Sequence, residues 1–409
     1  MNQNTITPTR VPLYLMLAII ALPQLSETIY SPALPRIAAA LGTSANWVEH
    51  TMTIYLMGFA CGVLWWGTHS DRRGRKPGLY WGWGIYALAS LGCFFSTHIS
   101  MLMLMRFIQA FGASTGSVLG LAIARDSSTA AERGKLFSSI SMGMAFAPAL
   151  GPVIGNMVEG MFGWSYIFVT LTLFACMLLW LIWSQLPETH TELHHDARFS
   201  TLVRRCLNRM LHDREILMNG VLIGGVNGIL FGYFAEAGFY FKHMLQVTPT
   251  FFVMMSFYAF IPLVSGSILS RILHEYRVQS VVIVRLGIAL VMTSASCFYG
   301  AAHLLGPDAQ TALLWTSIAG VAGILLGIRL VIPNVLGHAL ENYKEYAGTA
   351  ASLFGFYYYV LIALFTGLMA VLHNGTVMRL PLFFVLVGSC LVLAYWYGGF
   401  SKKQAVQLM

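Results

Sequence analysis

The feature that most constrains this chain is a series of twelve apolar runs separated by polar segments. A helix needs about 20 apolar residues to cross the hydrocarbon core of a bilayer. Charged residues make up 10% of the chain, too few to cover a water-facing surface. The sequence therefore predicts an all-α integral membrane protein with twelve transmembrane helices. The predicted spans are residues 12–34, 46–67, 78–97, 100–123, 135–158, 163–184, 216–241, 250–272, 280–303, 311–336, 346–371 and 379–398.

One long polar stretch, residues 185–215, divides these spans into two sets of six. It is rich in arginine and histidine, and no other interruption is as long. A division of this kind is typical of transporters that are built from repeated halves. We therefore predict two six-helix bundles, residues 1–184 and 216–409, which are joined by a cytoplasmic central loop at 185–215.

Basic residues are concentrated in alternate loops. Arg72–Lys76 and the central loop are strongly basic, whereas the intervening loops contain little beyond Arg36, Lys242 and Arg379. Because basic loops stay on the cytoplasmic side, we predict that both termini are cytoplasmic. The net charge of +8 reflects these loops rather than a nucleic-acid partner. We expect a multi-pass protein of the inner (cytoplasmic) membrane.

Several classes of function lack their sequence features. The six cysteines are far apart, and the spacing of His190, His194 and His195 is not that of a closed metal site. We therefore predict no disulfide framework and no bound metal. No phosphate-binding loop of an ATP-driven pump is present, and no catalytic cluster of His, Asp or Glu is visible. We expect neither an enzyme nor a cofactor, and the chain has no room for a receptor's signalling domain.

The loop after the second run carries the most specific motif, G-T-H-S-D-R-R-G-R-K-P. Gly67 permits two helices to approach closely, and Gly74 permits a tight turn. Asp71 lies among basic residues, including Arg72 and Arg75, with which it can pair. We interpret this charge cluster as a latch that stabilises one conformation. The alternative is a basic loop that only sets the membrane orientation.

This loop resembles the signature G-x-x-x-D-R-x-G-R-K of the major facilitator superfamily. Arg106–Ala113 is similar to the family's R-F-x-Q-G-x-G-A motif, with Ala110 in place of a glycine. Leu186–Thr189 is similar to the L-P-E-T that follows the sixth span. The fifth run resembles the antiporter motif, through Gly143, Pro148, Gly151, Pro152 and Gly155.

A further resemblance narrows the family. Glu27–Pro35 resembles the D-x-Y-L-P-A-L-P segment of drug:proton antiporters of the bicyclomycin and chloramphenicol resistance type, with Glu27 where Asp is usual. Pro333–Asn334 and Gly348–Leu353 are similar to other segments of that group. These matches run through most of the chain. They imply the major facilitator fold and proton-coupled efflux of small organic compounds by alternating access.

Two charged residues within the apolar runs are candidates for proton coupling. A carboxylate in hydrocarbon costs about 3 kcal/mol or more, so Glu27 should face a cavity where it can take up and release a proton. Arg106 keeps its charge at physiological pH and needs a partner. It could pair with Glu27, or with a neighbouring polar group, when that site is deprotonated. The alternatives are an interfacial Glu27 in water and a purely structural Arg106.

Other residues in the runs are candidates for lining a substrate cavity. Glu236 lies among aromatic residues that suit a cationic or amphipathic substrate, or else at the outer interface. Arg329 could bind an anionic substrate or sit at a helix contact. We interpret Glu49, at the mouth of the second run, as a carboxylate at a loop end. The full set of cavity candidates is Tyr30, Asn227, Tyr233, Glu236, Arg329 and Tyr358.

The sequence thus predicts a secondary transporter that couples the export of small organic compounds to protons. Its expected partners are a small-molecule substrate, protons and the lipid bilayer, and we expect a monomer that binds no nucleic acid. The alternative within transport is a dedicated exporter or importer of one metabolite or of a siderophore or other metal chelate. The alternative outside transport is a membrane-embedded enzyme or a receptor.

Overall fold

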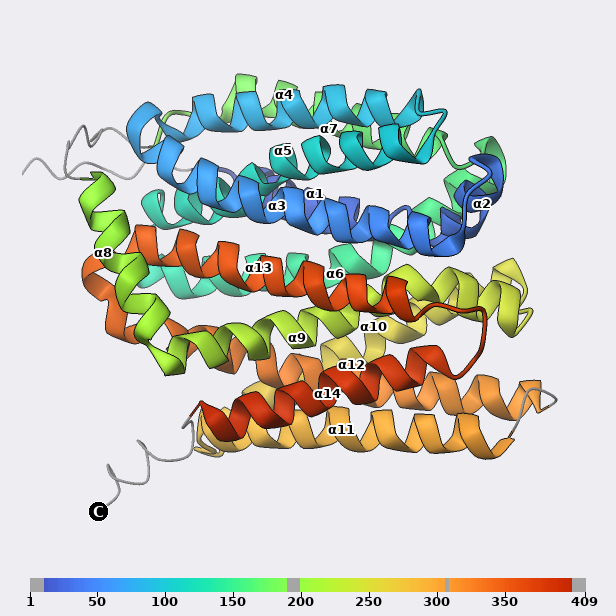
Figure 1. Cartoon of the computed structure of the whole chain (residues 1–409). Helices are drawn as coiled ribbons and strands as arrows, with labels where there is room; N and C mark the ends of the chain where they lie inside the picture. The colour runs from blue at the N-terminus through green and yellow to red at the C-terminus, as the bar shows by residue number, and fades with distance from the viewer. Residues whose placement is uncertain (1–10, 129, 190–198, 306–308, 399–409) are drawn as a thin grey trace, which may run out of the picture.

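The computed structural model describes residues 11–128, 130–189, 199–305 and 309–398. Within these ranges the chain is helical and contains no strand. Twelve helices of 16 residues or more run roughly along one axis (Figure 1), which confirms the predicted all-α fold. Their bounds are α1 Leu13–Thr28, α3 Ala45–Arg73, α4 Arg75–Phe94, α5 Ile99–Asp126, α6 Ala130–Phe162, α7 Tyr166–Gln185, α9 Arg214–Ala237, α10 Pro249–Glu275, α11 Ser280–Leu305, α12 Gln310–Ala339, α13 Ala347–Leu372 and α14 Arg379–Tyr397.

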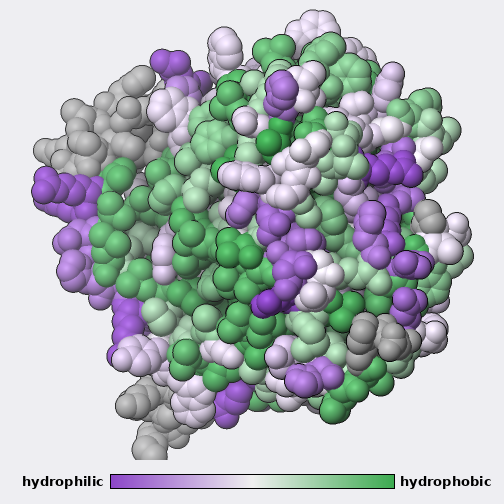
Figure 2. Space-filling view, turned by 45° about the vertical axis from the view of Figure 1, so that its right-hand side comes forward, coloured by the Kyte–Doolittle hydropathy of each residue, from purple (hydrophilic) through white to green (hydrophobic). Residues whose placement is uncertain are grey.

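The outer surface of the bundle is suited to lipid. The described residues contain nine helices that are long and apolar enough to cross a membrane. Large apolar side chains stand exposed on them and on their neighbours, such as Leu88 at 72% and Trp183 at 70%. Figure 2 shows apolar side chains over much of one face. Soluble proteins rarely expose apolar patches this extensive, so the protein is a multi-pass membrane protein.

The first apolar run is broken rather than continuous. α1 ends at Thr28, and the run continues as a single 3₁₀ turn, Ser31–Ala33, and then as α2, Leu34–Ala40. Each of these short segments has a proline near its start, where its missing amide hydrogen is not needed. The break places Glu27 in the last turn of α1.

The polar stretch between the two sets of spans contains a helix that hydropathy does not reveal. α8 covers Phe199–His212, so part of the segment predicted as a central loop, residues 185–215, is helical. Cys206 and Met210, one turn apart, are buried on one face, whereas the arginines of the other face are exposed. Such a helix is amphipathic and is therefore too polar on average to be recognised as a span. Three histidines of this stretch lie outside the described residues: His190, His194 and His195.

The long helices form two groups that pack chiefly within themselves. α1–α7 form the N-terminal half and α9–α14 the C-terminal half, and the halves meet where α3 lies along α13 and α6 along α10 (Figure 1). On α3, a side chain in place of Gly67 would collide with Ser352 of α13. The close helix approach predicted for Gly67 is therefore found, and it joins the two halves.

Several contacts between the halves lie at the end of the bundle opposite the last turn of α14, which we call the distal end (right in Figure 1). There Ser31 donates a hydrogen bond to the carbonyl of Phe234. Asn46 of α3 donates to the carbonyls of Ala370 and His373, at 2.6 and 3.0 Å. These bonds close the distal end of the space between the halves.

A lysine reinforces this closure. Lys242 lies in the π-helical turn Gly238–Met244 that follows α9. Its ammonium group donates to the carbonyl of Pro32 at 2.9 Å and to Asn156 at 3.1 Å. It also lies 3.5 Å from the carboxylate of Glu159, which Arg36 contacts at 3.1 Å. One cation of the C-terminal half is thus held by three groups of the N-terminal half.

Candidate functional site

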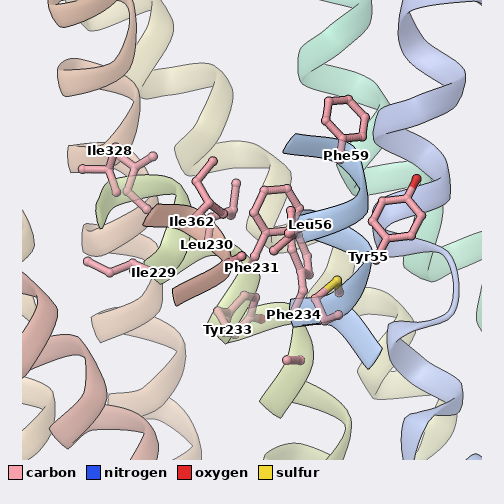
Figure 3. Close-up of a cluster of buried hydrophobic side chains, with 14 of the residues drawn as sticks. Tyr55, Leu56, Phe59, Ile229, Leu230, Phe231, Tyr233, Phe234, Ile328 and Ile362 are labelled. Carbon is pink, nitrogen blue, oxygen red and sulfur yellow. The ribbon is translucent and has the colours of Figure 1, made fainter. Parts of the chain in front are cut away.

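A cavity of about 170 Å³ lies between the halves, and α1, α6, α9, α10, α12 and α13 line it. Most of its wall is apolar. Figure 3 shows part of this wall, where Leu230, Phe231 and Phe234 of α9 lie near Ile328 and Ile362. The lining also includes polar and aromatic side chains that can form hydrogen bonds: Gln24, Glu27, Asn227, Arg329, Tyr358 and Tyr359.

The cavity is lined by one carboxyl group and one guanidinium group, which come from opposite halves. Glu27 of α1 is 1% exposed, and its Oε1 atom has no hydrogen-bond partner in the described part of the chain. Arg329 of α12 has a buried Nε atom that is likewise unpartnered among the described residues. Polar atoms left unpaired in an apolar site are costly, so both groups are available to a proton, water or substrate.

Arg106 of α5 lies outside this lining and is fully buried. Its guanidinium group is 4.0 Å from the centre of the Tyr30 ring and 4.0 Å from that of the Tyr55 ring. Its charge attracts the Glu27 carboxylate, but no ion pair joins these two side chains in the described structure. Of the two expected partners, the described structure therefore shows a neighbouring polar group, Gln109, and not Glu27; the two tyrosine rings also hold the cation.

A chain of hydrogen bonds extends from Arg106 toward α1. Arg106 donates to Gln109 at 2.5 Å, and Gln109 donates to Ser90 of α4 at 2.7 Å. Tyr86, one turn before Ser90, donates to Ser26 at 2.8 Å. Ser26 is the neighbour of Glu27 in α1. The sequence showed Gln109 as part of a motif, but the serines and Tyr86 look like ordinary small or aromatic span residues.

Three of the six cavity candidates line the cavity: Asn227, Arg329 and Tyr358. The other three do not, and their assignment is corrected. Tyr30 lies beneath Arg106, with its hydroxyl 3.2 Å from Thr51. Tyr233 borders two other cavities, of about 20 and 200 Å³, and Glu236 lies at the distal end beside His373. Hydropathy locates a residue in a span, but it does not say which neighbour that residue faces.

The predicted latch loop is a sharp turn between α3 and α4. Gly74 has φ +97°, a conformation that favours glycine, and it separates the two helices. The carboxylate of Glu188 accepts the backbone N–H groups of Arg75 and Lys76, at 3.0 and 3.1 Å. Glu188, from the L-P-E-T segment, thereby caps α4. The side chains of Asp71 and Arg72 lie outside the described part of the structure.

The glycines of the antiporter motif pack α6 closely against α1. A side chain at Gly143 would meet Leu17, and one at Gly151 or Gly155 would collide with Thr28 or Ile29. This contact positions the last turn of α1, which carries Glu27. Pro152 borders a small cavity beside Phe234, and the side chain of Pro148 is not described.

A second group of ionisable side chains joins the halves at the distal end. Glu49 of α3 is fully buried, not at an exposed loop end as interpreted from the sequence. Its Oε1 atom is 2.9 Å from Nδ1 of His373, which also lies 2.7 Å from Oε2 of Glu236. Burial alone would lower the pKa of His373, but the two carboxylates outweigh it and raise this pKa to about 10. We call these three residues the distal triad.

Comparison with known proteins places this architecture in a family. The sequence model of the Major Facilitator Superfamily matches residues 16–366. An uncharacterized transporter of Rickettsia bellii is 32% identical over 95% of this chain and 96% of its own length. A bicyclomycin resistance protein homolog of Haemophilus influenzae is 27% identical over 92% of this chain and 93% of its own. The xylose transporter of E. coli in a partially occluded inward open conformation shares the fold, with a TM-score of 0.69 at 12% identity over 94% of this chain and 95% of that one.

Proposed function

The chain belongs to the major facilitator superfamily, and from this premise we propose that it exports small organic compounds in exchange for protons. The members of this family are transporters rather than enzymes, which agrees with the cavity between two helical halves. Alternating access requires a site that can face either side of the membrane as the halves move. Here the central cavity is that site.

The observation that carries this proposal is the environment of Glu27. Its carboxyl group lines the cavity, is buried, and has an oxygen without a partner among the described residues. A carboxyl group in such a place can hold a proton in one state and release it in another, with Arg106 supplying a nearby positive charge. Protonation and substrate binding then favour different conformations, which couples the two flows.

The cavity also indicates the class of substrate. Its apolar wall suits an amphipathic compound, and Arg329 can bind an anionic or strongly polar group on it. At about 170 Å³ the cavity is smaller than the ~300 Å³ or more that drug-sized ligands occupy. A compound of that size would enter only after the halves move apart. The relative from Haemophilus influenzae, with bicyclomycin resistance in its name, supports a drug-like substrate.

The proposal includes an orientation in the membrane. Because basic loops lie on the side of the termini, we propose that both termini and α8 lie in the cytoplasm of a bacterial cell, with the protein in the inner membrane. The distal end then faces outward and is closed in this structure. Each chain carries both halves and a complete cavity, which supports transport by a monomer.

Proton movement in inverted membrane vesicles tests this function. A pH gradient is imposed, and a pH-sensitive dye is followed while lipophilic cations, neutral antibiotics and metal chelates are added in turn. We expect a substrate-triggered proton leak that Glu27→Gln abolishes and Glu27→Asp partly keeps, because Asp retains the carboxyl group. Glu275→Gln is the matched control, since Glu275 is an exposed carboxylate paired with Arg271.

The same experiment has results that contradict the proposal. If the proton leak is unchanged in Glu27→Gln, another residue must carry the proton, and Glu236 and Glu49 would be tested next. Transport of a labelled substrate that ignores the proton gradient would remove the coupling altogether. A response to one compound class alone would favour a dedicated carrier of one metabolite or chelate, which the presence of Arg329 in a small cavity also favours.

A further inference from the structure

We propose that the distal triad, Glu49, Glu236 and His373, is a binding site for a divalent transition-metal ion that bridges the two halves. One ligand atom from each of these residues lies within 4.8 Å of the other two. Glu49 comes from α3 of the N-terminal half, Glu236 from α9, and His373 from the loop after α13. The three therefore converge from separate elements of the fold.

The triad has more acceptors than donors. Glu49 and Glu236 are both fully buried. The described structure gives no hydrogen-bond partner to Oε2 of Glu49 or to Oε1 of Glu236, and neither carboxylate pairs with Lys or Arg there. The single Nδ1–H of His373 cannot satisfy both carboxylates at once. Buried acceptors left in this way are costly, and a bound cation would satisfy them.

The charges of the triad also match a divalent ion. With both carboxyl groups ionised, the triad and its protonated imidazole would carry a net negative charge inside the protein. When a divalent ion takes the place of the His373 proton, two carboxylates and a neutral imidazole balance its charge. One nitrogen and two carboxylate oxygens form a donor set that suits zinc and similar transition metals, and three protein ligands leave a coordination position for water.

The surroundings anchor the loop that carries His373 close to the distal surface. Asn46 of α3 donates to the backbone carbonyl of His373 at 3.0 Å, which anchors the loop that carries the ligand. Asn374 and Gly375, which follow directly in the chain, are exposed, so the triad lies just beneath the distal surface.

Bridging distinguishes this site from the central cavity. An ion bound by Glu49 on one half and by Glu236 and His373 on the other holds the distal end closed. No segment of the sequence predicts such a site, because the three ligands are far apart in the chain and only the packing of α3 against α13 and α9 brings them together. The inference stands on equilibrium binding and does not depend on proton-coupled export.

Zinc binding by the purified full-length chain tests the proposal. The protein is prepared in detergent without a histidine tag, stripped with a chelator, and dialysed against Zn²⁺ or Mg²⁺ before metal analysis. The starting chain carries His190→Ala, His194→Ala and His195→Ala, so that the central stretch contributes no histidine. We expect one tightly bound Zn²⁺ per chain and no comparable Mg²⁺, which prefers an octahedral shell of oxygen ligands.

Single substitutions then locate the ion. Glu49→Gln, Glu236→Gln and His373→Gln should each weaken zinc binding by more than about tenfold. His373→Cys should retain it, because a thiolate is also a zinc ligand. Glu275→Gln and His338→Gln, which alter groups at the other end of the bundle, serve as matched controls and should not change zinc binding.

Two results would overturn the proposal. One is the absence of zinc binding in the starting chain beyond a loosely bound background, which would leave the triad a proton-bridged contact. The other is zinc binding that survives in all three Gln variants. Size-exclusion chromatography of each variant without metal shows whether it is folded, and the Cys variant supplies a ligand-preserving test if His373→Gln does not fold.

Discussion

The central cavity and the distal end both bury carboxyl groups, but they surround them differently. Glu27 lines a cavity, belongs to one half, and keeps an oxygen unpartnered within the described residues. Glu49 and Glu236 come from opposite halves and share the imidazole of His373. Under the proposed function, the first arrangement would let an acid exchange its proton with little movement, whereas the second would break only if the halves separate. Equal burial therefore permits two different roles, and the neighbouring groups decide between them.

The largest expected effect is a difference in transport between substitutions at the central cavity and at the distal end. Glu27→Gln should abolish uphill transport while retaining exchange of substrate across the membrane, because the cavity remains but can no longer carry a proton. Glu236→Gln should retain uphill transport, at a changed rate, because it leaves the cavity lining intact. Uphill transport and counterflow of the same labelled substrate measure both properties. An equal loss of uphill transport in the two variants would show that the two sites do not differ in this role.

The next prediction compares the two buried arginines. Arg106→Ala removes a cation held between Tyr30 and Tyr55 and should lower the free energy of unfolding by about 2 kcal/mol or more. Arg329→Ala should cost less, because Arg329 lines a cavity and its Nε has no partner in the described structure. Denaturant unfolding of both variants in detergent measures the difference. A larger loss for Arg329→Ala would show that its structural role has been underestimated.

A pair of glycines tests how the cavity keeps its shape. Gly155→Ala would push a methyl group into the backbone of Ile29, at the point where α6 meets α1, and should destabilise the protein by about 1–3 kcal/mol. Gly160→Ala, one turn further on, meets no atom within 4 Å and should be neutral or slightly stabilising. Thermal unfolding of the two variants gives the comparison. Similar midpoints would mean that the α1–α6 contact yields easily.

The smallest expected effect concerns the distal end alone. Asn46→Ala removes two hydrogen bonds between the halves and should cost about 1 kcal/mol. The exposed Asn208 of α8 provides a control, and Asn208→Ala should change stability little. If the distal end closes as proposed, Asn46→Ala should also leave zinc affinity weaker than in the starting chain. Unaltered stability in Asn46→Ala would indicate that water replaces these bonds at no cost.

Much of the architecture and part of the site followed from the chain alone. The apolar runs predicted the long helices, since each must satisfy its own backbone hydrogen bonds in lipid. The motifs of α3, α5 and α6 pointed to a transporter of this superfamily, and the intramembrane charges drew attention to Glu27 and Arg106. Hydropathy could not reveal α8, because its arginines lower the average over an amphipathic helix.

The tertiary structure alone decided which of these residues face one another. The hydropathy of a predicted span indicates that Tyr30, Tyr233 and Glu236 are in the membrane region. It does not indicate which side of each helix faces its neighbours. Packing placed Arg106 between two tyrosine rings instead of against Glu27, and it buried Glu49 beside a histidine more than 300 residues away. Local sequence determines where helices form because backbone hydrogen bonding is local. The sites depend on contacts between helices distant in the chain, which only the folded bundle creates.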